Sequence, residues 1–577
     1  TSVEPQCLTT YKKTIIIYAL FCLVVFWFLR LYKSIWRFAS YSELLRVILA
    51  TVVTGVIYTG SLLVFNLHMP VSYYVIGITV QFIATLGIRF FYRFVLLLRG
   101  RTNNEVQKKN VMIIGAGSAG QMLFRDIKHA KETNETVACF IDDNPNKWDR
   151  YIDDVPVFGS RDHILEAVDK FNIEKIYVAV PSANPQDKRD ILRVCNETSC
   201  ELMNLPGMYQ LYTGQVSVSK MKKVQIEDLL GRDPIKPNMD EVFAYVRNKV
   251  VLITGVGSIG SELARQIASH NPKQLILFDI YENNAYDIQL ELRKKYPNLD
   301  LVTLIGSVRD SRKMFDLFKK YRPQIVYHAA AHKHVPLMED SPHDAIKNNV
   351  FGTFNIAKEA GMSGVKRMVL ISTDKAVRPT NIMGASKRIC EMVIQYMNSL
   401  YDTEYVAVRF GNVLGSNGSV VPLFKKQIAN GGPVTVTHPE IIRYFMTIPE
   451  AVSLVLEAGA YAEGGEIFIL DMGEPVKILD LAKNMIRLSG LTPGEDIEIQ
   501  FTGLRPGEKL YEELLIDEEN KKETKNKRIF IGSPRMMETE QFSELIAELD
   551  HAAFSEDPNI REVVKRLVPE YTYKQTK

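Results

Sequence analysis

The sequence predicts an α/β protein in which N-terminal transmembrane helices precede two doubly wound parallel-sheet domains. Three observations predict this fold class. Long runs without a charge occur within residues 1–100, and about 20 such residues suffice to cross a bilayer. Two apolar strands each enter a Gly-x-Gly-x-x-Gly turn, at 115–120 and at 255–260. Strand-like and helix-like stretches then alternate, as they do in a parallel sheet covered on both faces.

The chain is long and almost neutral. Its 577 residues exceed one ordinary core, so we expect several domains. Lys and Arg number 70 against 67 Asp and Glu, which leaves no basic field for nucleic acid, and we expect no nucleic-acid partner. The six cysteines show no close Cys-x-x-Cys pairing. Reduced thiols are therefore expected, rather than disulfides or a metal site.

The apolar runs predict about three membrane spans, at 14–29, 47–65 and 71–88, in a transmembrane region over residues 1–105. The loop after the first span carries four basic residues, Arg30, Lys33, Arg37 and Arg46. A second basic cluster follows the third span. The positive-inside rule then predicts a multi-pass protein of the inner (cytoplasmic) membrane, with the lipid bilayer as a partner, the N-terminus outside and the soluble domains in the cytoplasm. Because the chain starts at Thr1 without an initiator Met, we also expect an upstream segment, such as another span.

The first nucleotide-type unit is predicted over residues 106–220. Its strand enters the turn Gly115–Gly120, and the next strand ends at Asp142 and Asp143, about 20 residues on, where a ribose-binding acid is expected. No acid–base pair follows this turn. Two interpretations stay open, namely a ligand site or a nucleotide-like fold retained for packing or regulation. A polar linker over 221–245 leads to the second unit.

The second unit is predicted over residues 246–540, with a helical tail over 541–577. Val250–Thr254 is a buried strand, and the glycines after it lie on the turn into a helix, where backbone N–H groups approach a pyrophosphate. The next strand ends in Asp279, which favours the free ribose of NAD over NADP. The cofactor contacts expected from this turn and strand are Gly255, Gly257, Ser258, Ile259, Gly260 and Asp279.

Two further motifs follow strands of this unit. They are His328-Ala-Ala-Ala331 and Ser372-Thr-Asp-Lys375, and because parallel strands end at one sheet edge, we expect both to line one cleft. His332 and His334 alternate like strand positions, but a third metal ligand at a recognisable spacing is missing from the sequence. We therefore expect substrate-cleft or structural roles for these histidines and no metal.

The motifs together resemble the extended short-chain dehydrogenase/reductases. Within these they resemble the membrane-bound, retaining UDP-N-acetylglucosamine 4,6-dehydratases of polysaccharide and protein-glycosylation (bacillosamine-type) pathways. The motifs that carry the resemblance are Thr254-Gly255, His328–Ala331, Asn349–Thr353, Ser372–Ala376, Arg409–Gly415 and Leu504–Lys509. The turn at 254–260 is one residue shorter than the family's usual TGxxGxxG, and Ser307 stands where members commonly have an Asp near the adenine.

The resemblance implies NAD-dependent 4,6-dehydration of UDP-N-acetylglucosamine to UDP-2-acetamido-2,6-dideoxy-α-D-xylo-hex-4-ulose, with retention at C5. It assigns Asp374 as the acid for the C6 hydroxyl and Lys375 as the base at C5. These roles require a raised pKa at Asp374 and a lowered pKa at Lys375. The implied domain is an extended short-chain dehydrogenase/reductase with a small C-terminal substrate-binding part, and we expect a homo-oligomer, a dimer or higher.

Met383 and Lys387 occupy the places of Tyr and Lys in the superfamily's YxxxK pattern. Lys387 can still bind the nicotinamide ribose, but a thioether cannot exchange a proton. We hypothesise that Thr373 orients the C4 hydroxyl and that Asp374 or a water accepts its proton. In the resembling family, Met at this position accompanies retention at C5.

Further contacts complete the expected site. The additional cofactor contacts are Asp310, Ala329, Ala330 and Lys387. The expected substrate contacts are His332, Lys333, Asn412, Arg443, Arg505 and Glu508. Arginine–phosphate pairing gives the two arginines a physical reason to bind UDP, although each could instead serve a structural ion pair.

Two rival functions remain open. An NAD-dependent UDP-sugar 4-epimerase would act on the same substrate class, but it normally uses the Tyr that Met383 replaces. A non-enzymatic membrane scaffold would bind sugar nucleotide without turnover, and the Thr373–Lys375 stretch argues against it.

Overall fold

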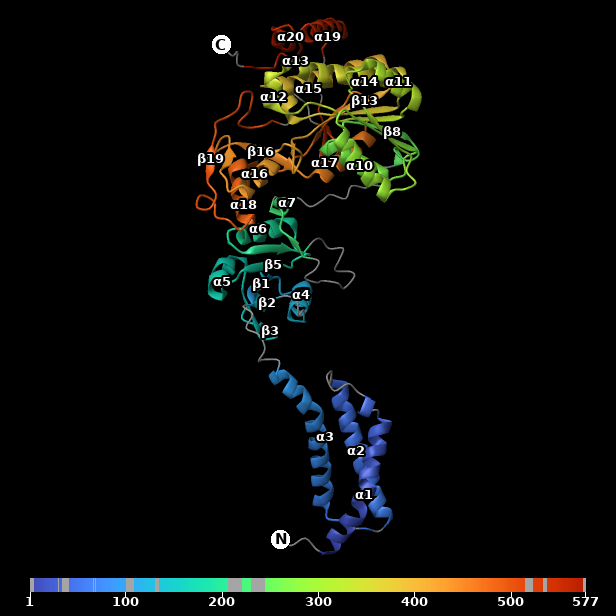
Figure 1. Ribbon diagram of the computed structural model, residues 1–577, viewed down its shortest axis with the longest axis vertical. Coiled ribbons are helices and arrows are strands. Elements are labelled where there is room, and N and C mark those ends of the chain that lie inside the picture. Colours follow the sequence, from blue (N-terminus) through green and yellow to red (C-terminus); the bar gives the residue numbers. More distant parts are fainter. Residues whose placement is uncertain are drawn as a thin grey trace. The chain divides into compact units, whose positions relative to one another are not determined.

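The computed structural model describes residues 5–29, 31–33, 41–65, 67, 69–99, 108–129, 134–205, 221–229, 244–513, 522–532 and 537–573. It divides into two compact units, Thr1–Lys108 and Lys109–Lys577, which are described separately below (Figure 1).

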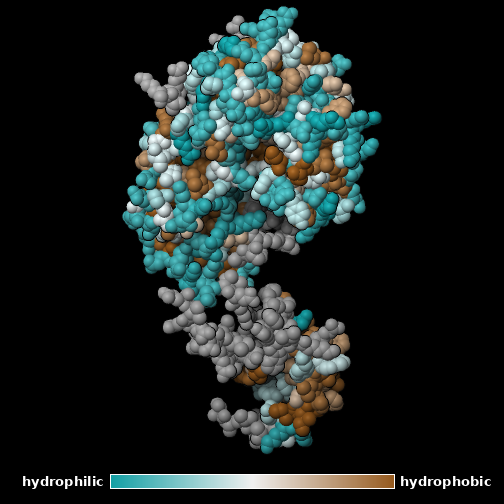
Figure 2. Space-filling model, turned by 45° about the horizontal axis from the view of Figure 1, so that its top comes forward, coloured by the Kyte–Doolittle hydropathy of each residue, from teal (hydrophilic) through white to brown (hydrophobic). Residues whose placement is uncertain are grey.

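The first unit consists of apolar helices that coincide with the three expected spans. They are α1 (Pro5–Phe28), α2 (Tyr41–Val64) and α3 (Val71–Arg99), with a 3-10 turn at Leu31–Lys33. Each has a stretch long and apolar enough to cross a membrane: Thr9–Phe28, Leu45–Val64 and Val71–Ile88. Large apolar side chains stay exposed along them (Figure 2), which lipid accommodates and water does not. Arg30, Arg37 and Arg101 lie outside the described residues, so the orientation stays a prediction.

The second unit begins with a seven-stranded sheet in the order β3-β4-β2-β1-β5-β6-β7. Its strands are β1 (Lys109–Ile114), β2 (Glu135–Ile141), β3 (Tyr151–Ile152), β4 (Val155–Gly159), β5 (Lys175–Val178), β6 (Glu201–Asn204) and β7 (Lys222–Lys223). Its helices are α4 (Ser118–His129), α5 (Ile164–Phe171), α6 (Pro185–Cys195) and α7 (Ile226–Leu229). Both β7 and α7 lie in the stretch 221–245, where we expected a linker, and β7 joins this sheet. Residues 230–243 of that stretch lie outside the described residues.

A second sheet of nine strands positions the site. Its order is β10-β9-β8-β11-β12-β13-β17-β21-β20. Successive strands add on one side of β8 up to β10, and from β11 onward they add on its other side. The strands are β8 (Val250–Thr254), β9 (Gln274–Asp279), β10 (Leu301–Ile305), β11 (Ile325–His328), β12 (Arg367–Ile371), β13 (Glu404–Arg409), β17 (Ile467–Leu470), β20 (Lys522–Glu523) and β21 (Ile529–Gly532). Strands β8 to β13 and β17 pair in parallel. Ligands of such sheets bind outside the carboxyl ends of the strands, at the switch point beside β8.

Helices cover both faces of this sheet (Figure 1). One apolar core holds α11 (Ser311–Tyr321), α14 (Gly352–Met362) and α15 (Ile382–Leu400), and the opposite core holds α9 (Ser258–Ala268), α10 (Glu282–Lys295) and α17 (Ile448–Ala460). The strands read as near-continuous apolar runs because both of their faces are buried. The helix α15 is buried around most of its circumference, because further helices pack on its outer side. They are α12 (Val335–Asp340), α13 (Pro342–Ala345), a π-helix (Ile346–Phe351), α19 (Thr539–Phe554) and α20 (Ile560–Leu567).

The C-terminal third adds a small lobe at the sheet's edge. It contains β14 (Asn412–Val413), α16 (Val420–Ala429), β15 (Val434–Val436), β16 (Ile442–Met446), β18 (Pro475–Lys477), α18 (Ile478–Leu488) and β19 (Ile499–Phe501). Its apolar side chains join one buried cluster with those of the first sheet domain. Asn196 also donates from Nδ2 to Oδ1 of Asn484 at 3.1 Å. The lobe therefore packs on the first sheet domain as well as on the second.

A buried ion pair joins β13 to α15. Arg409 and Glu391 are both fully buried, and two parallel bonds of 2.8 Å link the guanidinium to the carboxylate. Ser372, just after β12, donates from Oγ to the same carboxylate at 2.7 Å. Truncating one partner of such a pair leaves a buried charge without compensation.

Glu391→Gln is expected to cost about 3–5 kcal/mol of stability, because Arg409 then keeps a buried charge. Thermal unfolding of the detergent-solubilised protein would show a lower melting temperature. The matched control is Glu440→Gln, which removes an exposed pair with Lys477 at 2.9 Å and should leave the melting temperature unchanged. Equal melting temperatures for Glu391→Gln and the wild type would refute the role of the pair.

Candidate active site

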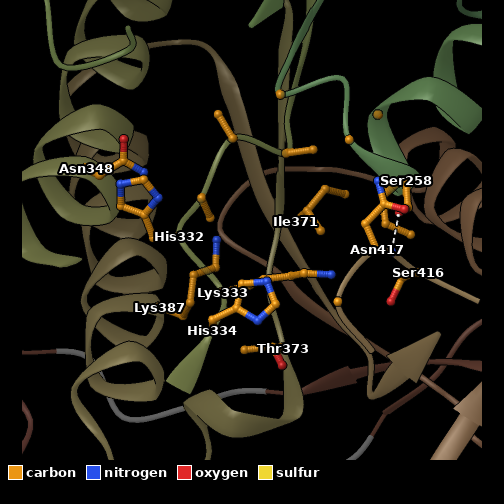
Figure 3. A pocket seen from close by; sticks show the side chains of 18 of the residues that line it. Ser258, His332, Lys333, His334, Asn348, Ile371, Thr373, Lys387, Ser416 and Asn417 are labelled. Atoms are coloured by element: carbon orange, nitrogen blue, oxygen red, sulfur yellow. Dashed lines mark hydrogen bonds between the residues drawn. The ribbon is translucent and has the colours of Figure 1, made fainter. Parts of the chain in front are cut away.

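A cavity of about 580 Å³ lies at the carboxyl ends of β8, β9, β11 and β12. Figure 3 shows it from close by, with Lys387 and His332 on one side and Ser258 and Asn417 on the other. The expected residues that line it are Gly255, Gly257, Ser258, Ile259, Gly260, Asp279, Ala329, Ala330, His332, Lys333, Thr373, Lys375, Met383, Lys387 and Asn412. The structure thus gathers residues of the glycine turn, of three strand ends, of α15 and of β14 around one space.

The three glycines of the turn differ in the space that surrounds their Cα atoms. Gly255 has φ +81°, and a Cβ there would lie 2.4 Å from the backbone nitrogen of Ala330. A Cβ on Gly260 would lie 1.8 Å from the carbonyl oxygen of Gly255, so the helix packs directly on the turn. A Cβ on Gly257, by contrast, would meet nothing within 4 Å. Gly257 therefore leaves open space at the N-terminus of α9, where a pyrophosphate is bound in dinucleotide folds.

Asp279 ends β9 beside this turn. Its Oδ2 accepts from the backbone N–H of Val256 at 2.5 Å and its Oδ1 from that of Tyr281 at 2.7 Å. These bonds fix a carboxylate that keeps free lone pairs for a ribose hydroxyl. Ile280, Ser307 and Val308 line the same end of the cavity. The turn, the open space at Gly257 and Asp279 together fit NAD.

Asp310 does not take part in this arrangement. Its side chain caps α11 by accepting from the backbone N–H of Lys313 at 3.0 Å. It is exposed and does not line the cavity, so the expected cofactor contact stays a prediction that the cavity lining does not support. A capping bond of this kind is a common use of Asp just before a helix.

The helix α15 brings Met383 and Lys387 to the cavity on successive turns. Lys387 is buried, and this burial lowers the pKa of its amine. The segment facing it is fastened by Asn349, whose Nδ2 donates to the carbonyl of His332 at 3.0 Å and to Oγ of Ser386 at 2.9 Å. Lys387 is thus held beside the end of β11, on the wall of the cavity.

The first histidine of this region is structural. His328 is fully buried, with hydroxyls of Thr254 and Thr353 at 2.7 and 3.0 Å from its two ring nitrogens. Burial lowers its pKa to about 3, so the ring is neutral. Among the described residues, His, Cys, Asp and Glu form no group of three that could hold a metal ion.

Asp374 and Lys375 form a close pair after β12. Asp374 is fully buried, and its Oδ1 accepts from Oγ1 of Thr373 at 2.9 Å and from Nζ of Lys375 at 3.0 Å. Its Oδ2 is buried and has no partner among the described residues. Gly411 packs beside this oxygen, since a Cβ there would lie 3.0 Å from it. Asp374 does not line the cavity itself, but its neighbours Thr373 and Lys375 do.

The environment of Lys375 differs from the one we expected. Burial disfavours the charged amine, but the carboxylates of Asp374 and Glu512 outweigh it, so the pKa of Lys375 is raised rather than lowered. Glu512 Oε1 lies 3.6 Å from Nζ. Glu512 is not among the residues expected from the sequence, because only tertiary folding brings the segment after Gly507 to β12. Its one sequence signal was its place just after the motif Leu504–Lys509.

Three of the expected substrate contacts lie outside the cavity and cluster together. Arg443 on β16 pairs through Nη2 with Oε1 of Glu508 at 3.3 Å and donates to the carbonyl of Lys509 at 2.8 Å. The backbone N–H of Arg505 donates to Oε2 of Glu508 at 3.1 Å. Arg443 is buried and Arg505 is exposed. In this structure Arg443 and Glu508 therefore serve an ion pair.

The sequence matches two protein-family profiles and is similar to curated proteins of known description. The sequence profile of a family described as polysaccharide biosynthesis protein matches residues 251–534, and that of a CoA-binding domain matches residues 30–206. The chain is 48% identical over 492 residues to the capsular polysaccharide biosynthesis protein CapD of Staphylococcus aureus, covering 84% of this chain and 81% of that one. It is 44% identical over 510 residues to the probable polysaccharide biosynthesis protein EpsC of Bacillus subtilis, with 86% and 83% covered.

Two further similarities each cover about half of this chain. The chain is 35% identical over 281 residues to UDP-glucose 4-epimerase of Rickettsia bellii, covering 47% of this chain and 79% of that one. Among solved structures, it is similar to a dTDP-glucose 4,6-dehydratase of Streptomyces venezuelae with NAD bound, at 20% identity and a TM-score of 0.41, with 46% and 87% of the two chains covered.

Gly257→Ala is expected to leave folding intact and to weaken NAD binding about tenfold or more, because its methyl group fills the open space at the turn. Calorimetric titration of the solubilised protein with NAD measures this. Gly117→Ala is the matched control, since a Cβ at that glycine of the first sheet domain also meets nothing within 4 Å. A Gly257→Ala protein that binds NAD as tightly as the Gly117→Ala protein would contradict the assignment.

Proposed function

Because the chain belongs to the polysaccharide biosynthesis protein family, we propose that it is an NAD-dependent enzyme acting on a nucleotide sugar, and specifically a 4,6-dehydratase of UDP-N-acetylglucosamine that retains the configuration at C5. The observation that carries this proposal is that one cavity is lined both by a dinucleotide cradle and by Thr373 and Lys375, the two residues that hydrogen-bond the buried carboxylate of Asp374. A reaction that only moved a hydride would not need such an acid–base pair.

Dehydration at C5 and C6 is difficult in an unmodified sugar, because the C5 proton is barely acidic. A ketone at C4 makes this proton acidic, so oxidation must precede elimination. NAD, when bound in the cradle, would accept the C4 hydride and return it to C6 after water has left, so that it is regenerated within the cycle. The protein's own groups must then handle the protons at the C4 hydroxyl, at C5 and at the C6 oxygen.

Asp374 is suited to two of these protons in turn. Thr373 orients the C4 hydroxyl, and the Asp374 carboxylate accepts its proton at Oδ2, the oxygen without a partner. The carboxylic acid so formed then donates that proton to the C6 hydroxyl, which leaves as water. Asp374 thus returns to a carboxylate within one cycle, and no outside proton is consumed at this step.

Lys375 is the base at C5. Its raised pKa means that the resting amine is protonated, so it must release a proton to water before it acts. Protonation of Asp374 removes one of the two carboxylates that stabilise the ammonium, which lowers the pKa of Lys375 when the base is needed. Return of the C5 proton from the same amine, on the same face, gives retention.

The membrane assignment is part of the proposal. The three apolar helices support a multi-pass anchor. The basic residues that follow the first and third helices support a cytoplasmic location for both sheet domains.

Asp374→Asn and Lys375→Ala are each expected to lower kcat by about 10²–10⁴, because each removes one proton-transfer group. The assay incubates the protein with NAD and UDP-N-acetylglucosamine and follows the product by mass and C5 stereochemistry. The wild type should yield a product lighter by one water. Lys358→Ala, a change of an exposed lysine on α14, should match the wild type.

A product equal in mass to the substrate would reject dehydration and favour the epimerase, to which the chain is 35% identical over 281 residues. Tight binding of UDP-N-acetylglucosamine without any product would favour the scaffold. Full turnover by either the Asp374 or the Lys375 variant would overturn the assigned roles.

Thr373→Val is expected to lower kcat by about 10²-fold, because the C4 hydroxyl loses the group that orients it. Thr373→Ser keeps the hydroxyl and should retain most of the activity.

Met383→Leu conserves volume in a buried position and removes only a thioether, so its activity should stay within about tenfold of the wild type. A large loss in Met383→Leu would show that the thioether has a role that this mechanism omits.

A further inference from the structure

Glu512 is a buried acid that lies between two cations of the site. Only 4% of its side chain is exposed, and its Oε1 lies 3.6 Å from Nζ of Lys375 and 3.7 Å from Nε of Arg443. Its Oε2 is buried and has no partner among the described residues. A buried carboxylate is costly unless it is paired, and Lys375 and Arg443 supply the opposite charges that offset this cost.

The segment that carries Glu512 is fastened to the loop that carries Lys375. Gly507 has φ +73°, and its carbonyl accepts from Oγ1 of Thr380 at 2.9 Å and from Nδ2 of Asn381 at 3.0 Å. Two residues later, Nζ of Lys509 donates to the carbonyl of Val377 at 3.0 Å. The position of Glu512 relative to Lys375 is therefore built into the fold and does not depend on one flexible side chain.

The amine of Lys375 lies among three side-chain oxygens. They belong to Asp374 at 3.0 Å, Asn412 at 3.4 Å and Glu512 at 3.6 Å. An ammonium has three N–H donors, so this arrangement suits the protonated amine and keeps its nitrogen at the cavity wall. Glu512 does not line the cavity itself, which means that it acts through Lys375.

We propose that Glu512 is a positioning residue that holds Lys375 at the cavity wall and shares its Oε1 with Arg443, so that the charge of Lys375 is linked to the charge of Arg443 on β16. This inference rests on the proposed function, in which Lys375 is the base at C5. It goes further by naming Glu512 as a group that favours the protonated form of Lys375 before Asp374 takes up its proton.

The charges that face Lys375 come from several elements. Asp374 lies beside it on the same loop, Glu512 comes from the segment after Gly507, and Arg443 comes from β16 and opposes the two carboxylates. Lys387 reaches the same cavity from α15. Glu512 is thus one of two negative groups that favour the ammonium, and its removal should make the amine easier to deprotonate.

The first test measures Lys375 directly and needs no turnover. The solubilised full chain is labelled with a trace of acetic anhydride across a range of pH, and the modification of the Lys375 peptide is followed by mass spectrometry. In Glu512→Gln the midpoint of reactivity should fall by about 1–3 pH units. Glu513→Gln is the matched control, because Glu513 pairs with Arg378 and Lys509 instead, and its midpoint should equal that of the wild type. A midpoint in Glu512→Gln that is unchanged or higher would overturn the proposal.

The second test uses the pH profile of kcat/KM for UDP-N-acetylglucosamine. The base must be neutral, so the rate rises with pH through the pKa of Lys375, and in Glu512→Gln this rise should move to lower pH. Glu512→Asp keeps the charge and should keep the wild-type position of the rise, even if it folds less well. A loss of rate that is uniform over all pH values in Glu512→Gln would indicate a merely structural role and overturn the proposal. If the labelling midpoint shifts while the wild type makes no dehydrated product, the proposed function fails and the positioning role stands.

Discussion

The buried pair of Glu391 and Arg409 is the interaction on which the arrangement of the site depends. Arg409 ends β13, Glu391 belongs to α15, and Ser372 follows β12, and one carboxylate connects all three. Each of these positions is followed or preceded by functional residues. Thr373, Asp374 and Lys375 come directly after Ser372, Gly411 and Asn412 come after Arg409, and Met383 and Lys387 lie upstream of Glu391 on α15. A shift of this pair would therefore move the proposed acid, the proposed base and the proposed ribose contact relative to one another.

The pKa values of two lysines at one cavity are shifted in opposite directions, and the neighbouring groups explain the difference. Lys387 is buried in α15, and desolvation outweighs the attraction of Glu391, so its pKa is lowered. Lys375 is also desolvated, but Asp374 and Glu512 lie within 3.6 Å of its amine, and its pKa is raised. Residue type alone therefore does not fix the state of either amine. The number of carboxylates within ion-pair distance does.

The two sheet domains repeat one turn geometry with different surroundings. Gly115 and Gly120 make the same close approaches as Gly255 and Gly260, and Asp142 accepts from the N–H of Ala116 at 2.8 Å as Asp279 does from that of Val256. Asp142, however, also pairs with Lys147 at 2.7 Å. The ammonium of Lys147 offsets the negative charge of the carboxylate that a ribose would meet. The glycine pattern thus specifies a turn, and the residues packed around it decide which ligands the turn can hold.

The sequence by itself determined those features that depend on neighbours along the chain. Apolar runs determined the three long helices, and the spacing of Gly255, Gly257 and Gly260 determined the strand-turn-helix unit and its open space, because turn geometry and hydrophobic periodicity are local. Tertiary structure decided what depends on distant charges. Arg443 is held by Glu508, and the distant Glu512 adds to Asp374 in raising the pKa of Lys375, opposite to the expected direction. Coulombic interactions act through space between segments that are far apart in sequence. A pattern of neighbouring residues therefore could not give the direction of a pKa shift that such distant charges cause.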